Sequence, residues 1–293
     1  MATFRDLVAS ERPLVLPGAH DAISARLIQR AGFKAYFIGG FPLVGARYCV
    51  PDIGLLALGE IGAGIRDTMA ASTLPVLVDA DNGYGDVKTV VHVINFYERL
   101  GAQAVFFEDQ VSPKRCGHIA GKQLLDARQM EANIRAAAEN LLNPDTFIIA
   151  RTDAREVYGL DEALRRGERY ARAGADGLFI EAPTSVEEMA RIGGAFDIPQ
   201  LANMLEGGRT PMLAPHDLTQ LGFRIIIYGI SPLMHAVRAM QSVLSSLANG
   251  DVSFAGAGAG GGVGFEEYKS IVDFEHWAQI EDRYQPKSNS SPR

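Results

Sequence analysis

Eight short apolar runs recur along the 293-residue chain, and their regular spacing is the feature that most limits how it can fold. Each run has the length of a buried strand and is rich in Val, Ile and Phe. The segments between them carry apolar residues at positions i, i+3, i+4 and i+7, as amphipathic helices do. The unit repeats at roughly 30 residues, which is typical of parallel βα units. The runs cover residues 14–19, 35–40, 75–81, 104–109, 146–153, 177–182, 200–204 and 224–229.

Four of the helix-type segments end in a glycine that leads into the next apolar run, namely Gly32, Gly101, Gly174 and Gly222. A glycine there can end a helix in the left-handed conformation before the chain enters a strand. Eight alternating units fit an α/β fold in which parallel strands close into a (β/α)8 TIM barrel without free edges. An open doubly wound sheet is the alternative, but the first turn, PGAHDAI, lacks that class's Gly-x-Gly-x-x-Gly pattern.

The end of the chain follows a different pattern. We expect the barrel to occupy residues 1–250. The stretch AGAGAGGGVG (255–264) predicts a flexible joint, and residues 265–284 read as one further helix. Residues 251–293 therefore form a Gly-rich joint with a helical tail.

Charge and cysteine content exclude several classes of protein. The net charge is −7 with no long run of one sign, so a nucleic-acid-binding face is not indicated. The two cysteines, Cys49 and Cys116, are too few for a disulfide framework, and we read Cys49 as structural. No signal-peptide pattern is present, and no apolar run approaches the roughly 18 residues of a membrane span. We expect a cytoplasmic protein, in which an anionic substrate must meet a local cation.

Polar residues stand at the C-terminal end of nearly every apolar run. In a parallel barrel these ends converge on one face, where catalytic groups collect. Each acid could instead cap the following helix, as Asp often does. A ring of acids with one arginine on a single rim is harder to explain by capping, and it favours a functional site. The ring consists of Asp79, Asp81, Glu108, Asp109, Arg151, Asp153, Glu181 and Asn203.

The acids of this ring predict a divalent metal. Asp79 and Asp81 are two residues apart, so on a strand they point the same way. Glu108 from the neighbouring run and Asp52 from the loop after the second run add further negative charge. Such carboxylates repel one another unless a hard cation lies among them, and Mg²⁺, or Mn²⁺ in its place, suits oxygen ligands. We expect Asp81 to bind the ion directly and the other three to act through water.

The segment KRCGH (114–118) predicts a reactive thiol shortly after the fourth run. Cys116 lies between Lys114, Arg115 and His118, and cations near a thiol lower its pKa. Such a thiol can exchange protons near neutral pH. The alternative, that Cys116 is a small buried hydrophobic residue as lone cysteines usually are, does not account for its charged neighbours.

Six motifs occur in the order DADNGYGD (79–86), FEDQ (107–110), KRCGH (114–118), ARTDA (150–154), IEAP (180–183) and LANM (201–204). Together they closely resemble the isocitrate lyase / phosphoenolpyruvate mutase superfamily, over most of the chain. KRCGH resembles its lyase branch, which includes the 2-methylisocitrate and 2,3-dimethylmalate lyases. The chain lacks the large insertion expected of isocitrate lyase itself.

The resemblance implies a Mg²⁺-dependent lyase that breaks the C2–C3 bond of a small 2-hydroxy di- or tricarboxylate. The products would be a 2-oxo acid such as pyruvate and a second carboxylate. Cys116 would protonate the departing carbanion, with Lys114 tuning the thiol. The resemblance further assigns Arg151 and His118 to clamping carboxylates, Asn203 and Glu181 to assisting, and the backbone N–H groups of Gly39 and Gly40 to holding the substrate's 1-carboxylate.

The resemblance also implies a homotetramer, a dimer of dimers in which the helix at 231–247 packs onto a neighbouring barrel. The chain departs from the family at two positions. In the loop IGGFPLVGARYCVPD (38–52), Gly39 replaces a serine common in the family. Phe37, the residue before this loop, replaces a tyrosine. Together with Phe41, this phenylalanine favours an alkyl-substituted substrate.

Two other functions remain open from the sequence. One is hydrolysis or decarboxylation of oxaloacetate, or phosphonate chemistry, on the same fold. The other is a non-catalytic, metabolite-binding barrel, against which the complete acid ring and KRCGH argue. The sequence leaves the substituents at C2 and C3 of the substrate undefined.

Overall fold

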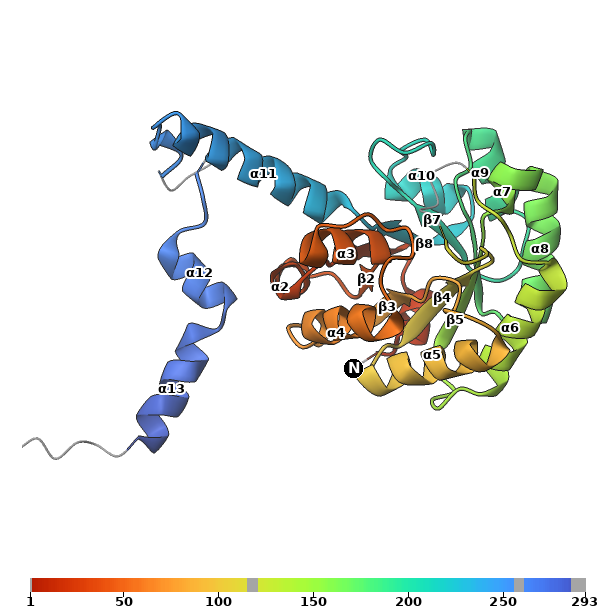
Figure 1. The fold of residues 1–293 in the computed structure, drawn as a ribbon, viewed down its shortest axis with the longest axis horizontal. Helices are drawn as coiled ribbons and strands as arrows, with labels where there is room; N and C mark the ends of the chain where they lie inside the picture. Colours follow the sequence, from red (N-terminus) through yellow and green to blue (C-terminus); the bar gives the residue numbers. More distant parts are fainter. Residues whose placement is uncertain (1, 115–120, 256–260, 286–293) are drawn as a thin grey trace, which may run out of the picture. The chain divides into compact units, whose positions relative to one another are not determined.

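A computed structural model describes residues 2–114, 121–255 and 261–285. Its eight strands are all parallel and pair in the order β1-β8-β7-β6-β5-β4-β3-β2, surrounded by helices (Figure 1). A bridge between Gly18 and Phe37 joins the two outer strands, and the Ala19 N–H donates to the Phe37 carbonyl at 2.8 Å. The predicted (β/α)8 barrel is confirmed. The strands are β1 (Leu14–Pro17), β2 (Tyr36–Ile38), β3 (Val76–Asp79), β4 (Ala104–Glu108), β5 (Phe147–Thr152), β6 (Gly177–Ile180), β7 (Gln200–Asn203) and β8 (Phe223–Tyr228).

Every apolar run of the sequence contains one strand, and the glycines between helices and strands behave as predicted. Gly32, Gly101, Gly174 and Gly222 all have positive φ, between +85° and +111°. The helices of the barrel unit are α1 (Phe4–Ser10), α2 (Ala22–Arg30), α3 (Gly40–Tyr48), α4 (Leu58–Met69), α5 (Val87–Leu100), α6 (Ala127–Glu139), α7 (Ala154–Tyr158), α8 (Leu160–Arg172), α9 (Val186–Gly193) and α10 (Pro215–Gln220).

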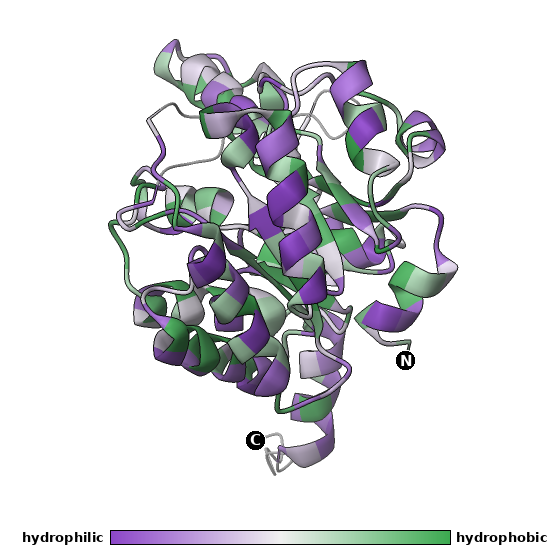
Figure 2. Ribbon diagram, turned by 90° about the vertical axis from the view of Figure 1, so that its right-hand side faces the viewer, coloured by the Kyte–Doolittle hydropathy of each residue, from purple (hydrophilic) through white to green (hydrophobic). Residues whose placement is uncertain are grey.

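Alternate residues of the strands fill the inside of the barrel. In Figure 2 the strands are mainly hydrophobic, whereas the surrounding helices alternate between hydrophobic and hydrophilic residues. These inward-facing strand residues form one apolar cluster, to which helix α1 adds Phe4, Leu7 and Val8. The Phe4 ring packs on Phe147, the first residue of β5, at 5.7 Å between ring centroids. The N-terminal end of the barrel is therefore closed by apolar packing. The strand residues of this cluster are Leu14, Leu16, Phe37, Leu77, Ala104, Phe106, Phe147, Ile149, Phe179, Leu201, Ile225 and Ile227.

Two segments differ from the sequence-based expectation. The loop after β2 contains helix α3, whose Pro42 lies in the first turn, where no intrahelical N–H bond is lost, and whose Leu43 is buried. The expected helix over 265–284 is two helices, α12 (Phe265–Ile271) and α13 (Phe274–Tyr284). The helical conformation is interrupted between them at Asp273, whose φ of +59° lies in the left-handed region. Cys49 ends α3 and is exposed.

The chain forms two compact units, Met1–His235 and Ala236–Arg293, with the division inside α11 (Ser231–Ala248). The first unit contains the barrel. The second contains the rest of α11, a short 3-10 helix η1 (Ser253–Ala255), α12 and α13. Within the described ranges, no helix has the length and hydrophobicity needed to cross a membrane.

Candidate active site

A cavity of about 230 Å³ lies at the C-terminal ends of the strands. Most of the residues predicted for the site line it. Cys116 and His118 lie outside the described residues. The lining residues are Phe37, Gly39, Gly40, Phe41, Pro42, Asp52, Asp79, Phe106, Glu108, Lys114, Arg151, Phe179, Glu181, Asn203, Leu205, Ile227, Gly229 and Ile230.

The alternation of strand side chains explains why the polar ring faces inward. Residues two apart on a strand point to the same side. Leu77, Phe106, Ile149, Phe179 and Leu201 fill the barrel, and the residue two positions later on each strand is polar. The inward-facing side chains are thus apolar within the barrel and polar at its C-terminal end. The polar residues reached in this way are Asp79, Glu108, Arg151, Glu181 and Asn203.

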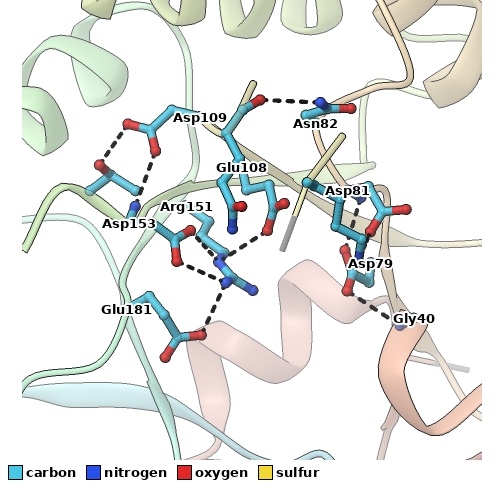
Figure 3. A network of polar contacts seen from close by, with 12 residues as sticks. Gly40, Asp79, Asp81, Asn82, Glu108, Asp109, Arg151, Asp153 and Glu181 are labelled. Atoms are coloured by element: carbon cyan, nitrogen blue, oxygen red, sulfur yellow. Dashed lines mark hydrogen bonds and ion pairs between the residues drawn. The ribbon is translucent and has the colours of Figure 1, made fainter. Parts of the chain in front are cut away.

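Arg151 is buried at the centre of one wall of the cavity (Figure 3). Its Nε and Nη2 donate to the two carboxylate oxygens of Asp153 at 3.0 and 3.1 Å. Glu108 and Glu181 each lie 3.4 Å from the guanidinium. Burial opposes its charge, but the three acids outweigh burial and raise the pKa of Arg151 well above its usual value. These hydrogen bonds and shortest ion-pair distances engage Nε and Nη2, whereas Nη1 points toward the side of the cavity that holds Asp79 and Gly40 (Figure 3).

Asp109 does not belong to the cavity, although the sequence placed it in the ring of acids. It follows Glu108 directly, so its side chain points outward, where it is fully buried. Its carboxylate accepts bonds from the Thr152 hydroxyl at 2.6 Å and the Asp153 N–H at 3.0 Å. Arg166 also donates to it at 2.9 Å. Asp109 therefore fixes the backbone that carries Asp153.

The opposite wall of the cavity carries a cluster of three acids, Asp52, Asp79 and Asp81, and Lys114 lies between Asp52 and Asp81. The Lys114 ammonium lies 2.6 Å from Asp52 and 2.5 Å from Asp81. Asp79 accepts from the Asp81 N–H at 2.9 Å and from the Gly40 N–H at 3.3 Å. Strand β3 ends at Asp79, and Asp81 has φ +50°, so the argument that the two side chains share one face of a strand does not apply. Asp81 lies behind the cavity, beside Asp52 and Lys114.

Three acids near the cavity, Asp52, Asp79 and Glu108, have pKa values above those of isolated carboxyl groups. Burial and then the charge of Asp81 raise the pKa of Asp79 to about 6. Burial raises the pKa of Asp52 and Glu108, against the opposing charges of Lys114 and Arg151. One oxygen of Glu108 is buried without a hydrogen-bond partner among the described residues. The pocket thus favours an added cation or proton.

The pocket floor and part of its rim are apolar, a feature that sequence analysis recognised only in Phe37 and Phe41. Phe106 and Phe179 form the floor, in edge contact at 5.7 Å. A side chain at Gly39 would place its Cβ 2.7 Å from the Phe37 ring. The ring of Phe37 therefore occupies the space next to Gly39. The strand alternation would have revealed the floor, because both aromatic residues stand two positions before a polar site residue.

A family model described as phosphoenolpyruvate phosphomutase matches residues 4–248. The chain belongs to this family. In this phosphoenolpyruvate mutase/isocitrate lyase superfamily, the 2,3-dimethylmalate lyase of Eubacterium barkeri is 40% identical over 283 residues, 97% of each chain. The 2-methylisocitrate lyase of Halalkalibacterium halodurans is 38% identical over 253 residues, 86% of this chain and 83% of the relative.

Solved structures agree with this family assignment. A 2,3-dimethylmalate lyase, described as a member of the superfamily, matches with TM-score 0.88 and 30% identity over 100% of this chain and 99% of its own. An oxaloacetate acetylhydrolase bound to 3,3-difluorooxalacetate matches with TM-score 0.90 and 28% identity over 98% and 97% of the two chains. The superfamily and the enzyme class predicted from the sequence are confirmed, and relatives named as lyases are among the matches.

Proposed function

We propose that this chain is a Mg²⁺-dependent carbon–carbon lyase that cleaves a 2-hydroxy dicarboxylate or tricarboxylate into a 2-oxo acid such as pyruvate and a second carboxylate. The observation that carries the proposal is the pairing of a buried arginine with an acid cluster across one small cavity. Lysis of the C2–C3 bond leaves negative charge on the departing fragment, and preorganised cations lower that barrier most.

Arg151 would hold the carboxylate of the departing fragment. Asp153 and the two glutamates fix two of its guanidinium nitrogens, and Nη1 remains for an anionic ligand. Asn203 donates to Glu181 at 3.5 Å, and its Oδ1 has no hydrogen-bond partner among the described residues. Gly39 caps α3 and Gly40 is its first residue, so their N–H groups lie at a helix N-terminus where the substrate's 1-carboxylate would bind, taking the Gly40 N–H in place of Asp79.

The donor set fits Mg²⁺, for which Mn²⁺ could substitute. Mg²⁺ prefers oxygen ligands, keeps several waters and needs only one or two carboxylates. Within the described ranges, no three His, Cys, Asp or Glu side chains are grouped to share one ion. We assign Asp81 as the direct ligand, with Asp79, Glu108 and Asp52 acting through water. The bound ion would supply positive charge to the substrate's hydroxyl and carboxylate.

Cys116 would donate the proton that completes the reaction. A base removes the proton of the C2 hydroxyl, whose oxygen becomes the carbonyl of the 2-oxo acid as the C2–C3 bond breaks. The electron pair of that bond stays on C3 of the departing fragment, and the thiol proton converts it into a C–H bond. Lys114, two residues before Cys116, lines the cavity and would tune the thiol, and His118 would assist in holding carboxylates. A thiol with this role must stay reduced, which fits a cytoplasmic setting.

The cavity favours a small, alkyl-substituted dicarboxylate over a tricarboxylate. At about 230 Å³ it is smaller than the ~300–1,000 Å³ pockets that hold drug-sized ligands. Phe37, Phe41 and Leu205 supply apolar wall, and the described lining offers only Lys114 and Arg151 as cations. Substrates related to 2,3-dimethylmalate therefore fit better than 2-methylisocitrate.

A substrate panel with Mg²⁺ tests the proposal. We expect pyruvate from 2,3-dimethylmalate or another alkylmalate, and none in excess chelator. Cys116→Ser should lower turnover by about 10²–10⁴-fold, the usual contribution of a general acid, while substrate binding survives. Full activity in that variant would remove Cys116 from the chemistry, and pyruvate release in excess chelator would remove the metal.

Hydrolysis of oxaloacetate is the second candidate, favoured by the similarity to oxaloacetate acetylhydrolase. That reaction needs a water held beside the substrate carbonyl. The same panel separates the two functions, because oxaloacetate would give oxalate and acetate.

We also propose that further copies of the chain cover α11, within a homotetramer. In the second unit, α11 exposes a row of apolar residues, with 55% of Met240, 63% of Leu244 and 49% of Leu247 accessible. An isolated helix cannot keep so much apolar surface in water without a partner. Light scattering should give the tetramer mass for the wild type and a smaller mass for Leu244→Asp. A monomeric wild type would exclude the exchange of helices.

A further inference from the structure

Lys122 is a fully buried lysine that no part of the mechanism above uses. Its ammonium lies 3.3 Å from Asp153 Oδ1 and forms a second ion pair with Glu156. The backbone around it is anchored to the end of β4: the Val111 N–H donates to the Gln123 carbonyl and the Leu125 N–H to the Asp109 carbonyl, both at 2.8 Å. Such anchoring keeps the ammonium at one place beside the strand.

Asp153 therefore stands between two buried cations. Its Oδ1 accepts from Arg151 Nη2 at 3.1 Å and lies 3.3 Å from Lys122 Nζ, while Oδ2 accepts from Arg151 Nε at 3.0 Å. The Asp153 backbone is fixed by Asp109. Lys122 and Arg151 thus both contact the Asp153 carboxylate, so Lys122 helps to set the angle of that carboxylate and, through it, the plane of the guanidinium.

The charges around Arg151 give Lys122 a second effect. Three acids surround one arginine, and this excess of negative charge opposes the binding of a substrate carboxylate. Lys122 offsets part of the charge on Asp153 without entering the cavity, which it does not line. The positive charge of Arg151 is then better available to an anion.

We propose that Lys122 is a positioning residue for Arg151: through Asp153 it orients the guanidinium and strengthens its hold on a substrate carboxylate. The kinetic part of this proposal rests on the proposed lyase function. The structural part, the orientation of Arg151, does not.

Kinetics of Lys122→Met and Lys122→Arg test the first part. Removal of the charge should raise KM at least about tenfold, because a misplaced clamp weakens carboxylate binding. Lys122→Arg keeps the charge and should stay within about threefold of the wild type. Partial unfolding would instead lower kcat and leave KM unchanged, and that result would overturn the proposal. Arg155→Met is the matched control, since Arg155 lies on the same helix α7 as Glu156 but pairs with Glu188 at 2.9 Å, and its KM should not change.

A charge-balanced double variant guards against misfolding. Lys122→Met/Glu156→Gln removes one charge of each sign, so it avoids leaving a charged Glu156 with its other ion-pair partner, Arg209, but without Lys122. We expect it to fold and to keep the raised KM. A wild-type KM in this variant would show that Lys122 only neutralises Glu156, and the proposal would fail.

A crystal structure of the same double variant separates this proposal from the proposed function. The Arg151 guanidinium should be rotated or occupy more than one position. An unchanged guanidinium would refute the positioning role, whether or not any substrate is turned over. If the wild type turns over no member of the substrate panel but the guanidinium moves, the lyase function fails and the positioning role stands.

Discussion

Both ends of the barrel place an arginine over a phenylalanine ring, with opposite consequences. At the N-terminal end, Arg5 lies 5.3 Å from the Phe147 ring, is 39% exposed and pairs with one acid, Asp176. At the mouth, Arg151 lies 5.1 Å from the Phe179 ring, is 8% exposed and meets three acids. The same chemical pair thus forms a partly exposed contact at one end and, at the other, the buried cation that we propose as the clamp on a substrate carboxylate. Burial distinguishes the two arginines, together with the acids that hold the Arg151 side chain in place.

The largest effect should come from removing Arg151, the proposed clamp. Arg151→Met should lower kcat/KM by at least about 10²–10³-fold. It also removes the positive charge beside buried Glu108 and Glu181 and leaves Asp153 with Lys122 as its remaining cation among the described residues, which should cost roughly 3–5 kcal/mol of unfolding free energy at neutral pH. Steady-state kinetics and urea unfolding measure the two losses. Arg151→Lys keeps the charge but not the fork of donors, so it should recover stability more than activity. Equal recovery of both would contradict the clamp.

At the closed end, the largest expected effect is on stability alone. Phe4 is fully buried against Phe147, and Phe4→Ala should lower the unfolding free energy by roughly 3–5 kcal/mol. Phe41→Ala is the matched change at the mouth. Phe41 is 37% exposed, so the stability should change by about 0.5 kcal/mol or less, while KM for alkyl-substituted substrates rises. Changed kinetic constants for folded Phe4→Ala would show that the two ends are not separable.

The raised pKa of Asp79 predicts that metal binding at the C-terminal end of the barrel depends on pH. The pKa of Asp79 is raised to about 6, so in the metal-free protein its contribution to stability is full below the unfolded value of 3.8 and is lost as pH rises through 6. The Mg²⁺ that we propose for this site would compete with that proton. Its affinity should be constant above pH 7 and fall below pH 6 by up to about tenfold per unit for one proton. Calorimetric titration between pH 5 and 8 measures this, and an affinity that stays constant over the whole range would exclude Asp79 from the site.

The apolar runs and their spacing indicated the eight strands, and the convergence of strand ends in a parallel barrel predicted that Glu108, Arg151 and Glu181 meet at one face. The period-two pattern of strands, applied only to Asp79 and Asp81, could have sorted the inward from the outward residues. The same pattern explains the error at Asp109, which ends its run beside Glu108 but faces the opposite side. Knowing which alternate residues of each strand face inward would have removed Asp109 from the predicted ring.

The remaining differences lie where the chain leaves the strands. Asp81 and Lys114 are placed by loops, and a left-handed residue such as Asp81 turns its side chain in a direction that no periodicity encodes. The ion pair of Lys114 with Asp52 and Asp81 joins residues 62 and 33 positions apart in the chain, so it depends on loop conformation. Helix α3 escaped notice because Pro42 and the glycines around it are typical of turns, although a proline is tolerated in a first helical turn.

The smallest effect should come from the arginine at the closed end. Arg5 pairs with Asp176 at 2.7 Å and donates to the Thr146 carbonyl at 3.1 Å, but its side chain remains partly exposed to solvent. An exposed ion pair contributes little, so Arg5→Met should lower the unfolding free energy by about 0.5–1 kcal/mol and leave kcat and KM unchanged. Urea unfolding and steady-state kinetics, measured beside Arg151→Met, check both. A raised KM in Arg5→Met would mean that the charge of an arginine acts on the cavity through the whole length of the barrel, and burial among acids at the mouth would no longer explain what distinguishes Arg151.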